Sequence, residues 1–236
     1  MTASPLQTCV ILAGGLGTRL RSVVSDVPKC LAPVGSRPFL EIQIRSLADA
    51  GVNDVVLSLG HMSEKVIAAI DQRLAGIDVR HVVERELLGT GGAIAHVLDT
   101  LGLDEVLVAN GDTYLDGDLA AMLAPLDRAQ GELFRMAVVE VPSRARFGGV
   151  ELGDAGRVLR FLEKGQAGGG FINAGLYRLC RSALPSGRSG AYSLEVDVLP
   201  ELVRQQQVKA CAIHGNFIDI GVPEDYRLFC ETHGQS

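Results

Sequence analysis

A glycine-rich loop with two cations nearby is the first feature of the sequence that could do chemistry. Gly14, Gly15 and Gly17 follow an apolar run, and Arg19 and Lys29 come soon after them. Glycines let a backbone aim its N–H groups at phosphate oxygens, and a guanidinium can bind two such oxygens at once. A glycine turn alone is as often structural, so the two cations are what favour phosphate binding.

The spacing in this loop excludes two common nucleotide-binding motifs. If Gly15 and Gly17 opened a dinucleotide fingerprint, the third glycine position would hold Leu20. A Walker loop would end in Gly-Lys-Ser or Gly-Lys-Thr, and this loop does not. The segment therefore predicts a phosphate site of another kind.

Strand-like and helix-like segments alternate through the first half of the chain. Strands are expected at 9–13, 55–59, 79–83 and 106–109, with helices opening at Pro38, at Ser63 and after Gly92. The helix from Ser63 is expected to include Leu74 and to end near Gly76. This rhythm predicts an α/β fold, a doubly wound, mostly parallel, Rossmann-like α/β/α sandwich. Ligands of such sheets collect at the carboxyl ends of the strands, where the loops of Gly15, Gly89 and Gly111 lie.

The second half predicts a mixed β region. Strands are expected at 134–141, 149–152, 158–162, 171–179 and 208–213, with helices near Ser193 and from Pro223. No internal repeat or linker separates this region from the first half. We therefore expect one domain over residues 1–236.

Composition narrows the partners and the compartment. The net charge of −6 argues against general nucleic-acid binding, which needs a basic field. No apolar run reaches the roughly 18 residues of a membrane span, and no basic segment precedes the first apolar run as in a signal peptide. The five cysteines are odd in number and form no C-x-x-C pair, which is typical of reduced thiols. A cytoplasmic protein that binds neither membrane nor nucleic acid is expected.

Two linked segments resemble a known family. The sequence GGLGTRL at 14–20, followed by PKCLAPV at 28–34, closely resembles the signature of the sugar-phosphate nucleotidyltransferases. The resemblance continues in order through LGTGGA at 88–93, NGD at 110–112, FLEK at 161–164, NAGLY at 173–177 and DIGVPEDY at 219–226. It implies an enzyme that joins a nucleoside triphosphate to a sugar 1-phosphate and releases pyrophosphate.

The resemblance also implies roles for individual residues. Arg19 and Lys29 would be catalytic cations, and Asp112 with Asp219 would bind Mg²⁺. The implied nucleotide-binding residues are Leu12, Ala13, Gly14, Gly15, Gly17, Thr18, Arg19, Glu84, Gly89 and Asp112. The implied sugar-phosphate residues are Gly111, Glu163, Lys164, Asn173 and Gly175. Nucleotide binding would then fall in a half at about 1–115 and sugar binding in a half at about 116–236.

Structural alternatives exist for several of these residues. An Asn-Gly-Asp segment is more often a turn than a metal ligand. Glu163 and Lys164 could be a solvated pair, and Asn173 with Gly175 could form a β-bulge. Ser193 could simply cap a helix.

The expected substrates follow from the same resemblance. Glu84 lies five residues before Gly89, where the family reads the base, and a carboxylate complements the two adjacent donors of guanine, so GTP is expected. The chain looks most like guanylyltransferases acting on D-glycero-D-manno-heptose 1-phosphate, which feed bacterial capsule or lipopolysaccharide assembly. A mannose 1-phosphate guanylyltransferase, a uridylyl- or thymidylyltransferase and an inactive nucleotide-sugar-binding module are the alternatives. An oligomer is possible.

Overall fold

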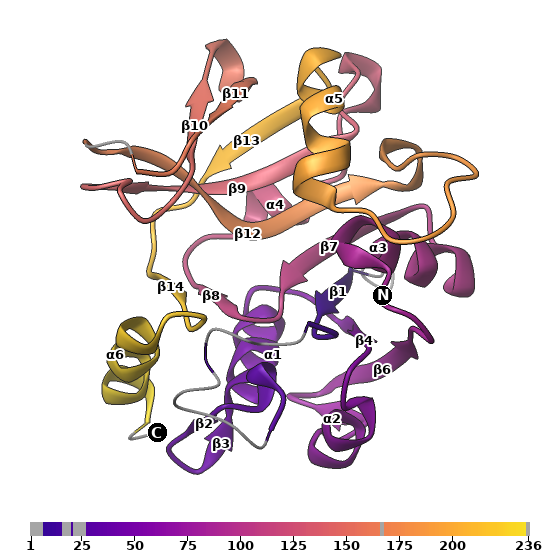
Figure 1. The fold of residues 1–236 in the computed structure, drawn as a ribbon, viewed down its shortest axis with the longest axis vertical. Coiled ribbons are helices and arrows are strands. Elements are labelled where there is room, and N and C mark those ends of the chain that lie inside the picture. The colour runs from indigo at the N-terminus through magenta and orange to yellow at the C-terminus, as the bar shows by residue number, and fades with distance from the viewer. Residues whose placement is uncertain (1–6, 16–19, 21–26, 166–167, 235–236) are drawn as a thin grey trace, which may run out of the picture. The chain divides into compact units, whose positions relative to one another are not determined.

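The computed structural model describes residues 7–15, 20, 27–165 and 168–234 (Figure 1). It divides the chain into two compact units that are interleaved in sequence. The first unit comprises Met1–Leu87, Ala109–Tyr114 and Phe217–Ser236, and the second comprises Leu88–Val108 and Leu115–Asn216. The first unit thus takes residues from both of the halves expected from the sequence.

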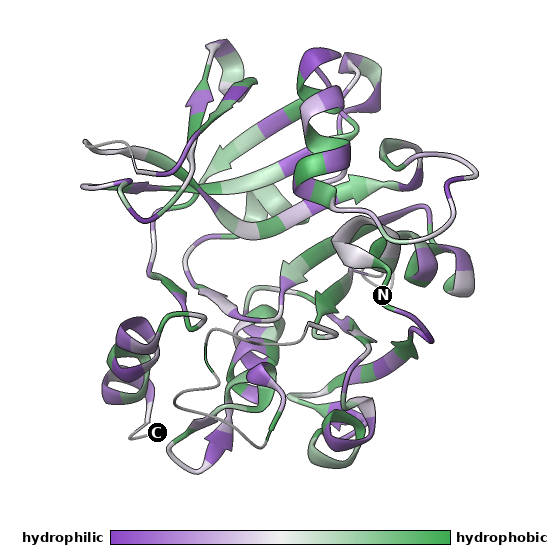
Figure 2. Cartoon of the chain, in the orientation of Figure 1, coloured by the Kyte–Doolittle hydropathy of each residue, from purple (hydrophilic) through white to green (hydrophobic). Residues whose placement is uncertain are grey.

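A parallel sheet forms the centre of the first unit. Strands β1 (Thr8–Leu12), β4 (Asp54–Leu59) and β6 (Ile77–Val83) pair in parallel in that order, and the short β5 (Arg73–Leu74) adds an antiparallel edge. Every residue of β4 is buried, as expected of a central parallel strand. Outer strand β6 instead alternates apolar and polar residues, which Figure 2 shows as colour bands.

Helices and short strands complete the first unit. They are the 3₁₀ turn η1 (Lys29–Leu31), the hairpin β2 (Pro33–Val34) and β3 (Arg37–Pro38), α1 (Phe39–Asp49), α2 (Ser63–Ala69), the pair β8 (Thr113–Leu115) and β14 (Phe217–Asp219), and α6 (Pro223–His233). Helix α2 is shorter than its apolar pattern predicts. It ends at Ala69, and Leu74 lies in β5.

An aromatic cluster joins four segments of this unit. Phe229 of α6 packs against Phe39 of α1 and Tyr114 of β8, with ring centroids 5.2 and 5.0 Å apart, and stacks on His233 at 4.1 Å. The buried members of the cluster are Leu20, Ala32, Val34, Phe39, Tyr114, Ile220, Tyr226 and Phe229. Because these residues come from distant parts of the sequence, their packing holds those parts together.

The second unit contains a mixed sheet. Strands β11 (Val158–Leu162), β10 (Gly149–Leu152), β12 (Gly170–Cys180) and β9 (Phe134–Val141) pair antiparallel, and β13 (Val208–Ala212) pairs with β9 in parallel. Beside β12 lies β7 (Glu105–Asn110), most of which belongs to this unit. The helical elements are α3 (Gly89–Leu101), α4 (Ala120–Leu123), η2 (Arg128–Gln130), η3 (Asp154–Gly156), η4 (Arg181–Ala183), the π-helical η5 (Leu194–Val198) and α5 (Leu199–Arg204).

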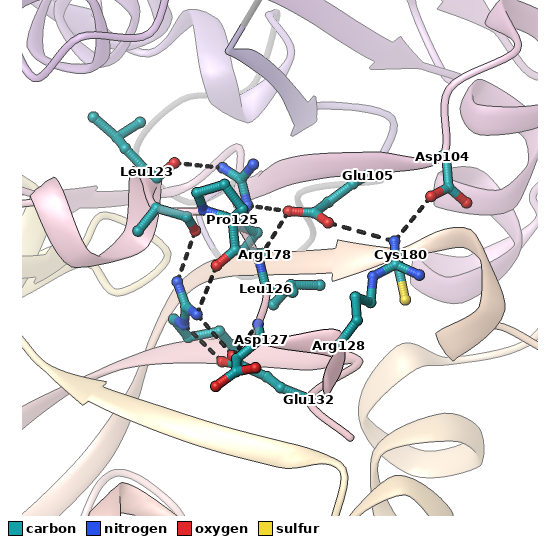
Figure 3. Close-up of polar contacts among 12 residues, drawn as sticks. Asp104, Glu105, Leu123, Pro125, Leu126, Asp127, Arg128, Glu132, Arg178 and Cys180 are labelled. Atoms are coloured by element: carbon teal, nitrogen blue, oxygen red, sulfur yellow. Dashed lines mark hydrogen bonds and ion pairs between the residues drawn. The ribbon is translucent and has the colours of Figure 1, made fainter. Parts of the chain in front are cut away.

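A network of ion pairs ties the segment after α4 to this sheet (Figure 3). Glu105 accepts hydrogen bonds from Arg178 Nε at 2.5 Å and from the Leu126 N–H at 3.1 Å. The fully buried Glu132 carboxylate accepts from Arg135 and from the Asp127 N–H. Burial opposes the charge on Glu105, but these hydrogen bonds, Arg178 foremost, hold its pKa below the usual value. The network stabilises the fold, and nothing in it resembles a binding site.

The predicted Rossmann-like α/β fold is confirmed, with parallel strands in the first half and a mixed sheet in the second. The third helix begins at Gly89 rather than after Gly92. Ser193 caps η5, since its side chain accepts the Val196 N–H. Among the described residues, no helix has both the length and the apolar character of a membrane span.

Candidate active site

Lys29 lies between two aspartates in the first unit. Its Nζ donates to Asp112 Oδ2 at 2.6 Å and lies 3.9 Å from Asp219 Oδ1. The lysine side chain is 11% exposed, whereas the aspartate side chains are 31% and 22% exposed. The structure therefore brings three of the predicted site residues together, with carboxylate oxygens that a ligand can still reach.

The loop that carries Asp112 is attached to two other segments. The Gly111 N–H donates to the Leu12 carbonyl at 3.1 Å, and the Ile220 N–H donates to the Asp112 carbonyl at 3.0 Å. A Cβ at Gly111 would lie 2.4 Å from the Leu12 oxygen, so this close approach requires glycine. The Asp112 main chain is thereby fixed to the end of β1 and to the turn after Asp219.

The turn after β14 is built around the Asp219 carboxylate. Asp219 Oδ1 accepts the Gly221 N–H at 2.7 Å. A Cβ at Gly221 would lie 2.2 Å from Lys29 Nζ and 2.6 Å from Asp219 Oδ1. Because Gly221 has no side chain, the ammonium group of Lys29 has room beside this carboxylate.

Helix α6 holds the segment that carries Lys29. The Tyr226 hydroxyl donates to the Pro33 carbonyl, and Cys230 Sγ lies 3.7 Å from the same oxygen. Burial raises the pKa of Tyr226, so the hydroxyl keeps the proton that it donates. One residue earlier, the Ala32 N–H donates to the Lys29 carbonyl at 3.0 Å and closes η1. Tyr226 thus connects α6 to the turn that aims Lys29.

The described part of the glycine-rich loop lies against Glu84. A Cβ at Gly14 would lie 3.0 Å from Glu84 Oε1, and one at Gly60 would lie 2.6 Å from it. The carboxylate of Glu84 therefore occupies space that only glycines leave open. Gly15 borders open space, and the Ala13 N–H donates to the Ser58 carbonyl at 2.9 Å, which continues the sheet past Leu12. The predicted phosphate-binding residues Gly17, Thr18 and Arg19 lie outside the described residues.

Gly89 lies in the second unit, packed against the main chain of Tyr192. A Cβ at Gly89 would lie 2.5 Å from the Tyr192 carbonyl oxygen, and the Gly91 N–H donates to that oxygen at 3.0 Å. Between them, the Thr90 hydroxyl donates to Glu195 at 2.7 Å. These contacts give the glycines a packing role. Contact of Gly89 with a nucleotide stays a prediction.

Four of the five predicted sugar-phosphate residues lie in the second unit, whereas Gly111 lies in the first. Glu163 and Lys164 follow β11 and are exposed. Asn173 donates to the Tyr177 hydroxyl at 2.8 Å and accepts the Gly175 N–H at 2.9 Å. The β12–β9 register shifts after Asn173, and Gly175 has a φ of +69°. Asn173 and Gly175 therefore form a bulge, and their contact with a sugar stays a prediction.

A comparison of sequences identifies the family. The family model described as nucleotidyl transferase matches residues 8–233. The chain belongs to the nucleotidyl transferase family. It is therefore an enzyme, as the glycine loop and the second segment at 28–34 predicted.

Curated relatives of this nucleotidyl transferase cover nearly its whole length. It is 34% identical to the D-glycero-alpha-D-manno-heptose 1-phosphate guanylyltransferase of Campylobacter jejuni, over 93% of this chain and 97% of the relative. It is 36% identical to the protein of the same name from Aneurinibacillus thermoaerophilus, over 92% of this chain and 94% of that relative. Among solved structures, HddC from Yersinia pseudotuberculosis superposes with a TM-score of 0.85 at 34% identity, over 96% of this chain and 99% of that one.

Gln43 and Gly60 are site residues that the sequence did not indicate. Gln43 is 4% exposed and donates to the carbonyls of Asn110 and Thr113 on either side of Asp112. The signal for it was a polar residue among the apolar positions of the buried face of α1, between Leu40 and Ile44. Gly60 had no signal, because its role depends on where Glu84 lies in three dimensions.

The carboxylates of this nucleotidyl transferase fit a hard divalent cation. Among the described residues, no group of three or more His, Cys, Asp and Glu side chains could hold a metal ion. Mg²⁺, however, is commonly held by one or two carboxylates together with substrate phosphates and water. Asp112 and Asp219 supply two such carboxylates, both within 4 Å of the same ammonium nitrogen.

Cys9 and Cys30 are buried thiols. Burial raises the pKa of Cys30 and of Cys9 to about 12, so neither is a thiolate at neutral pH. All five cysteines of the chain are unpaired, as the sequence predicted.

We expect Gly221→Ala to disable the site while the fold survives. The new methyl group would displace the Lys29 ammonium from Asp219, and losing one placed charge at a reacting centre typically lowers turnover by roughly 10²–10³-fold. Turnover is measured as pyrophosphate release and folding as thermal unfolding.

Gly102→Ala is the matched control. Gly102 ends α3 with a φ of +65° and open space around its Cβ position, so alanine there costs backbone strain alone. Its turnover should match the parent. Normal turnover of a folded Gly221→Ala protein would contradict the role given to Gly221.

Proposed function

We propose that this nucleotidyl transferase converts GTP and D-glycero-α-D-manno-heptose 1-phosphate to a GDP-heptose and pyrophosphate. The observation that carries the proposal is the placement of Lys29 between Asp112 and Asp219 beside the glycine-rich loop. In the reaction an oxygen of the sugar phosphate bonds to the α-phosphorus of GTP. The bond from that phosphorus to the bridging oxygen breaks, and pyrophosphate leaves with the electron pair.

Charge is the main obstacle to this reaction, since both substrates are anions. The protein therefore has to place cations and N–H dipoles before the substrates meet. Lys29 supplies an ammonium group for the phosphates, and Arg19 with the loop Gly14–Gly17 is proposed to bind the triphosphate. No general base is required, because the attacking phosphate oxygen is already ionised.

Asp112 and Asp219 are proposed to hold a divalent metal ion, specifically Mg²⁺. The bound ion would neutralise phosphate charge and order the triphosphate. The two carboxylates would hold the ion, and the hydrogen bond from the Gly221 N–H orients that of Asp219.

The proposed base is guanine, and Glu84 is the residue proposed to recognise it. The solved structures similar to this chain include HddC from Yersinia pseudotuberculosis in complex with GMP-PN. Glu84 follows β6 and lies against Gly14, so a base near the glycine-rich loop would meet a carboxylate. Guanine offers two adjacent N–H donors to the acceptor oxygens of the Glu84 carboxylate, whereas uracil and thymine offer one N–H between two acceptor oxygens.

The proposed acceptor is a heptose 1-phosphate. Lys164 would bind its phosphate, and Glu163, Asn173, Gly175 and Gly111 would contact the sugar. The two heptose relatives are matched over 97% and 94% of their length. A mannose-1-phosphate guanylyltransferase from Danio rerio is 35% identical but matched over only 62% of its length. Mannose 1-phosphate is therefore the second candidate.

The cellular role follows from the substrates. We propose that the enzyme acts in the cytoplasm, where it makes a nucleotide-sugar for capsule or lipopolysaccharide assembly. It would act as one functional domain made of a nucleotide-binding half and a sugar-binding half. The unpaired cysteines are typical of a reducing compartment, and GTP is available there.

One assay tests the reaction itself. Purified protein is incubated with Mg²⁺, each of GTP, ATP, UTP and dTTP, and each of the heptose and mannose 1-phosphates, and pyrophosphate is measured. We expect release with GTP and the heptose phosphate. Binding of nucleotide without any pyrophosphate release would instead identify an inactive nucleotide-sugar-binding module.

Removing one metal-binding carboxylate should stop the reaction. Asp219→Asn is expected to lower turnover by about 10²–10³-fold, since it removes one charge-stabilising contact in the transition state. Asp71→Asn, which changes an exposed aspartate of the same unit, serves as the control and should behave as the parent. Near-normal turnover of a folded Asp219→Asn protein would exclude this carboxylate from catalysis.

Lys164→Ala should mainly weaken apparent affinity for the sugar phosphate. We expect its KM for the sugar 1-phosphate to rise at least tenfold, about 1.4 kcal/mol, while the KM for GTP stays close to that of the parent. Lys209→Ala on β13 of the same unit is the control. An unchanged sugar-phosphate KM in Lys164→Ala would remove Lys164 from this role.

Glu84→Gln should reduce the preference for GTP. The amide would set a donor against a guanine donor, so we expect kcat/KM for GTP to fall by one to two orders of magnitude. Glu86→Gln, two residues on and exposed, is the control. A parent that prefers UTP or dTTP would rule out the guanylyl assignment, whereas GTP preference untouched by Glu84→Gln would exclude only Glu84.

A further inference from the structure

Gln43 is the one polar residue on the buried face of α1. The helix buries Phe39, Leu40, Ile44 and Leu47 beside it, and the glutamine itself is 4% exposed. A buried amide is costly unless its N–H and carbonyl groups find partners. Where this amide forms its hydrogen bonds therefore shows what it does.

Both N–H groups of Gln43 bond to the loop that carries Asp112. Nε2 donates to the Asn110 carbonyl and to the Thr113 carbonyl, each at 2.8 Å. These two carbonyls are the ones that flank Gly111 and Asp112 in the chain. A single amide group thus spans the loop from one side to the other, and all of these residues belong to the first unit.

The carbonyl oxygen of Gln43 fixes the direction of the amide. Oε1 is buried and accepts no hydrogen bond from the described residues. Turning the amide over would place this oxygen against two other carbonyl oxygens, so the orientation with both N–H groups toward the loop is the favourable one. An aliphatic side chain would leave no buried oxygen here, but it would release both loop carbonyls.

The Asp112 loop is therefore held at three places. Gly111 bonds to Leu12, the Asp112 carbonyl accepts from Ile220, and Gln43 spans the loop from α1. The Asp112 side chain itself accepts from Lys29 Nζ at 2.6 Å and from the Thr113 hydroxyl at 3.3 Å. The position of the main chain decides whether the carboxylate can reach Lys29 at that distance.

We propose that Gln43 is a positioning residue, whose amide fixes the Asn110–Thr113 loop so that the Asp112 carboxylate meets both Lys29 and the metal ion. The proposal rests on the proposed function, because it takes Asp112 as a metal ligand. Groups that orient metal ligands without touching the metal typically change metal affinity or activity by about 10–100-fold when they are replaced.

Two substitutions remove the hydrogen bonds in different ways. Gln43→Met keeps the length of the side chain and removes both donors. Gln43→Glu keeps the shape and places carboxylate oxygens against the two carbonyls, so it should have the larger effect. Arg45→Met is the matched control, since Arg45 lies on the exposed side of the same helix and pairs with Glu41.

A double-mutant cycle separates positioning from general stability. We expect Gln43→Met to lower kcat by about 10–100-fold with little change in the KM for the sugar phosphate. In an Asp112→Asn protein the same change should cost almost nothing further, because the carboxylate that it misplaces is already gone. Equal losses in both backgrounds, or a folded Gln43→Met protein with parental kcat, would overturn the proposal. So would failure of both Gln43 variants to fold, which would assign the residue to stability alone.

Metal binding gives a readout that needs no turnover. Mn²⁺ is titrated into each protein without nucleotide, and free Mn²⁺ is counted by electron paramagnetic resonance. We expect Gln43→Met to bind Mn²⁺ at least tenfold more weakly than the parent and Arg45→Met to bind it equally. Equal binding by the parent and Gln43→Met, including none by either, would contradict the proposal. If the parent binds Mn²⁺ but transfers no nucleotide, the proposed function fails while the role of Gln43 is still decided.

Discussion

Two carboxylates held near each other repel unless a cation lies between them, and Lys29 supplies that cation. Two unit charges 4 Å apart near a protein surface interact by about 4 kcal/mol, so two aspartates beside one ammonium group are far better tolerated than two aspartates alone. The rest of the first unit depends on this arrangement. Gly221 is a glycine because the ammonium needs the space, and Tyr226 bonds to Pro33 because the turn that carries Lys29 needs an anchor.

The fold of the first unit brings these charges together from distant parts of the chain. Lys29 follows the glycine-rich loop, Asp112 follows β7, and Asp219 precedes α6. The packing of Phe229 against Phe39 and Tyr114 joins the same three regions through apolar contacts. Hydrophobic burial thus provides free energy that keeps these three charged residues together. This division explains why α6, the last helix of the described chain, belongs to the unit formed mainly by the first 87 residues.

The sequence predicted the strands better than the packing around the candidate site. The alternation of apolar and polar residues and the apolar runs predicted the bounds of β9, β10 and β11 without error. They could do so because the burial of a strand follows from the local order of apolar and polar residues. Helix α2 was predicted too long, since Leu74 fits a helical period but its side chain is buried from β5 instead. Contact of Gly89 with the nucleotide stays a prediction, and its packing against the Tyr192 main chain could not be read from the local sequence. Gly60 depends on a contact between distant segments that no local pattern records, whereas the local signal for Gln43 was a polar residue among the apolar positions of α1.

Under the proposed function, the position of Lys29 would couple nucleotide binding to metal binding. A triphosphate would draw the ammonium group away from Asp112 Oδ2, which lies 2.6 Å from it, and would so strengthen the hold of the two carboxylates on a metal ion. The metal ion in turn would reduce the repulsion among the phosphates. Such a coupling is reciprocal by thermodynamic necessity, so each ligand would tighten the binding of the other by the same factor. The carboxylates would then bind the metal ion without nucleotide as well, but more weakly.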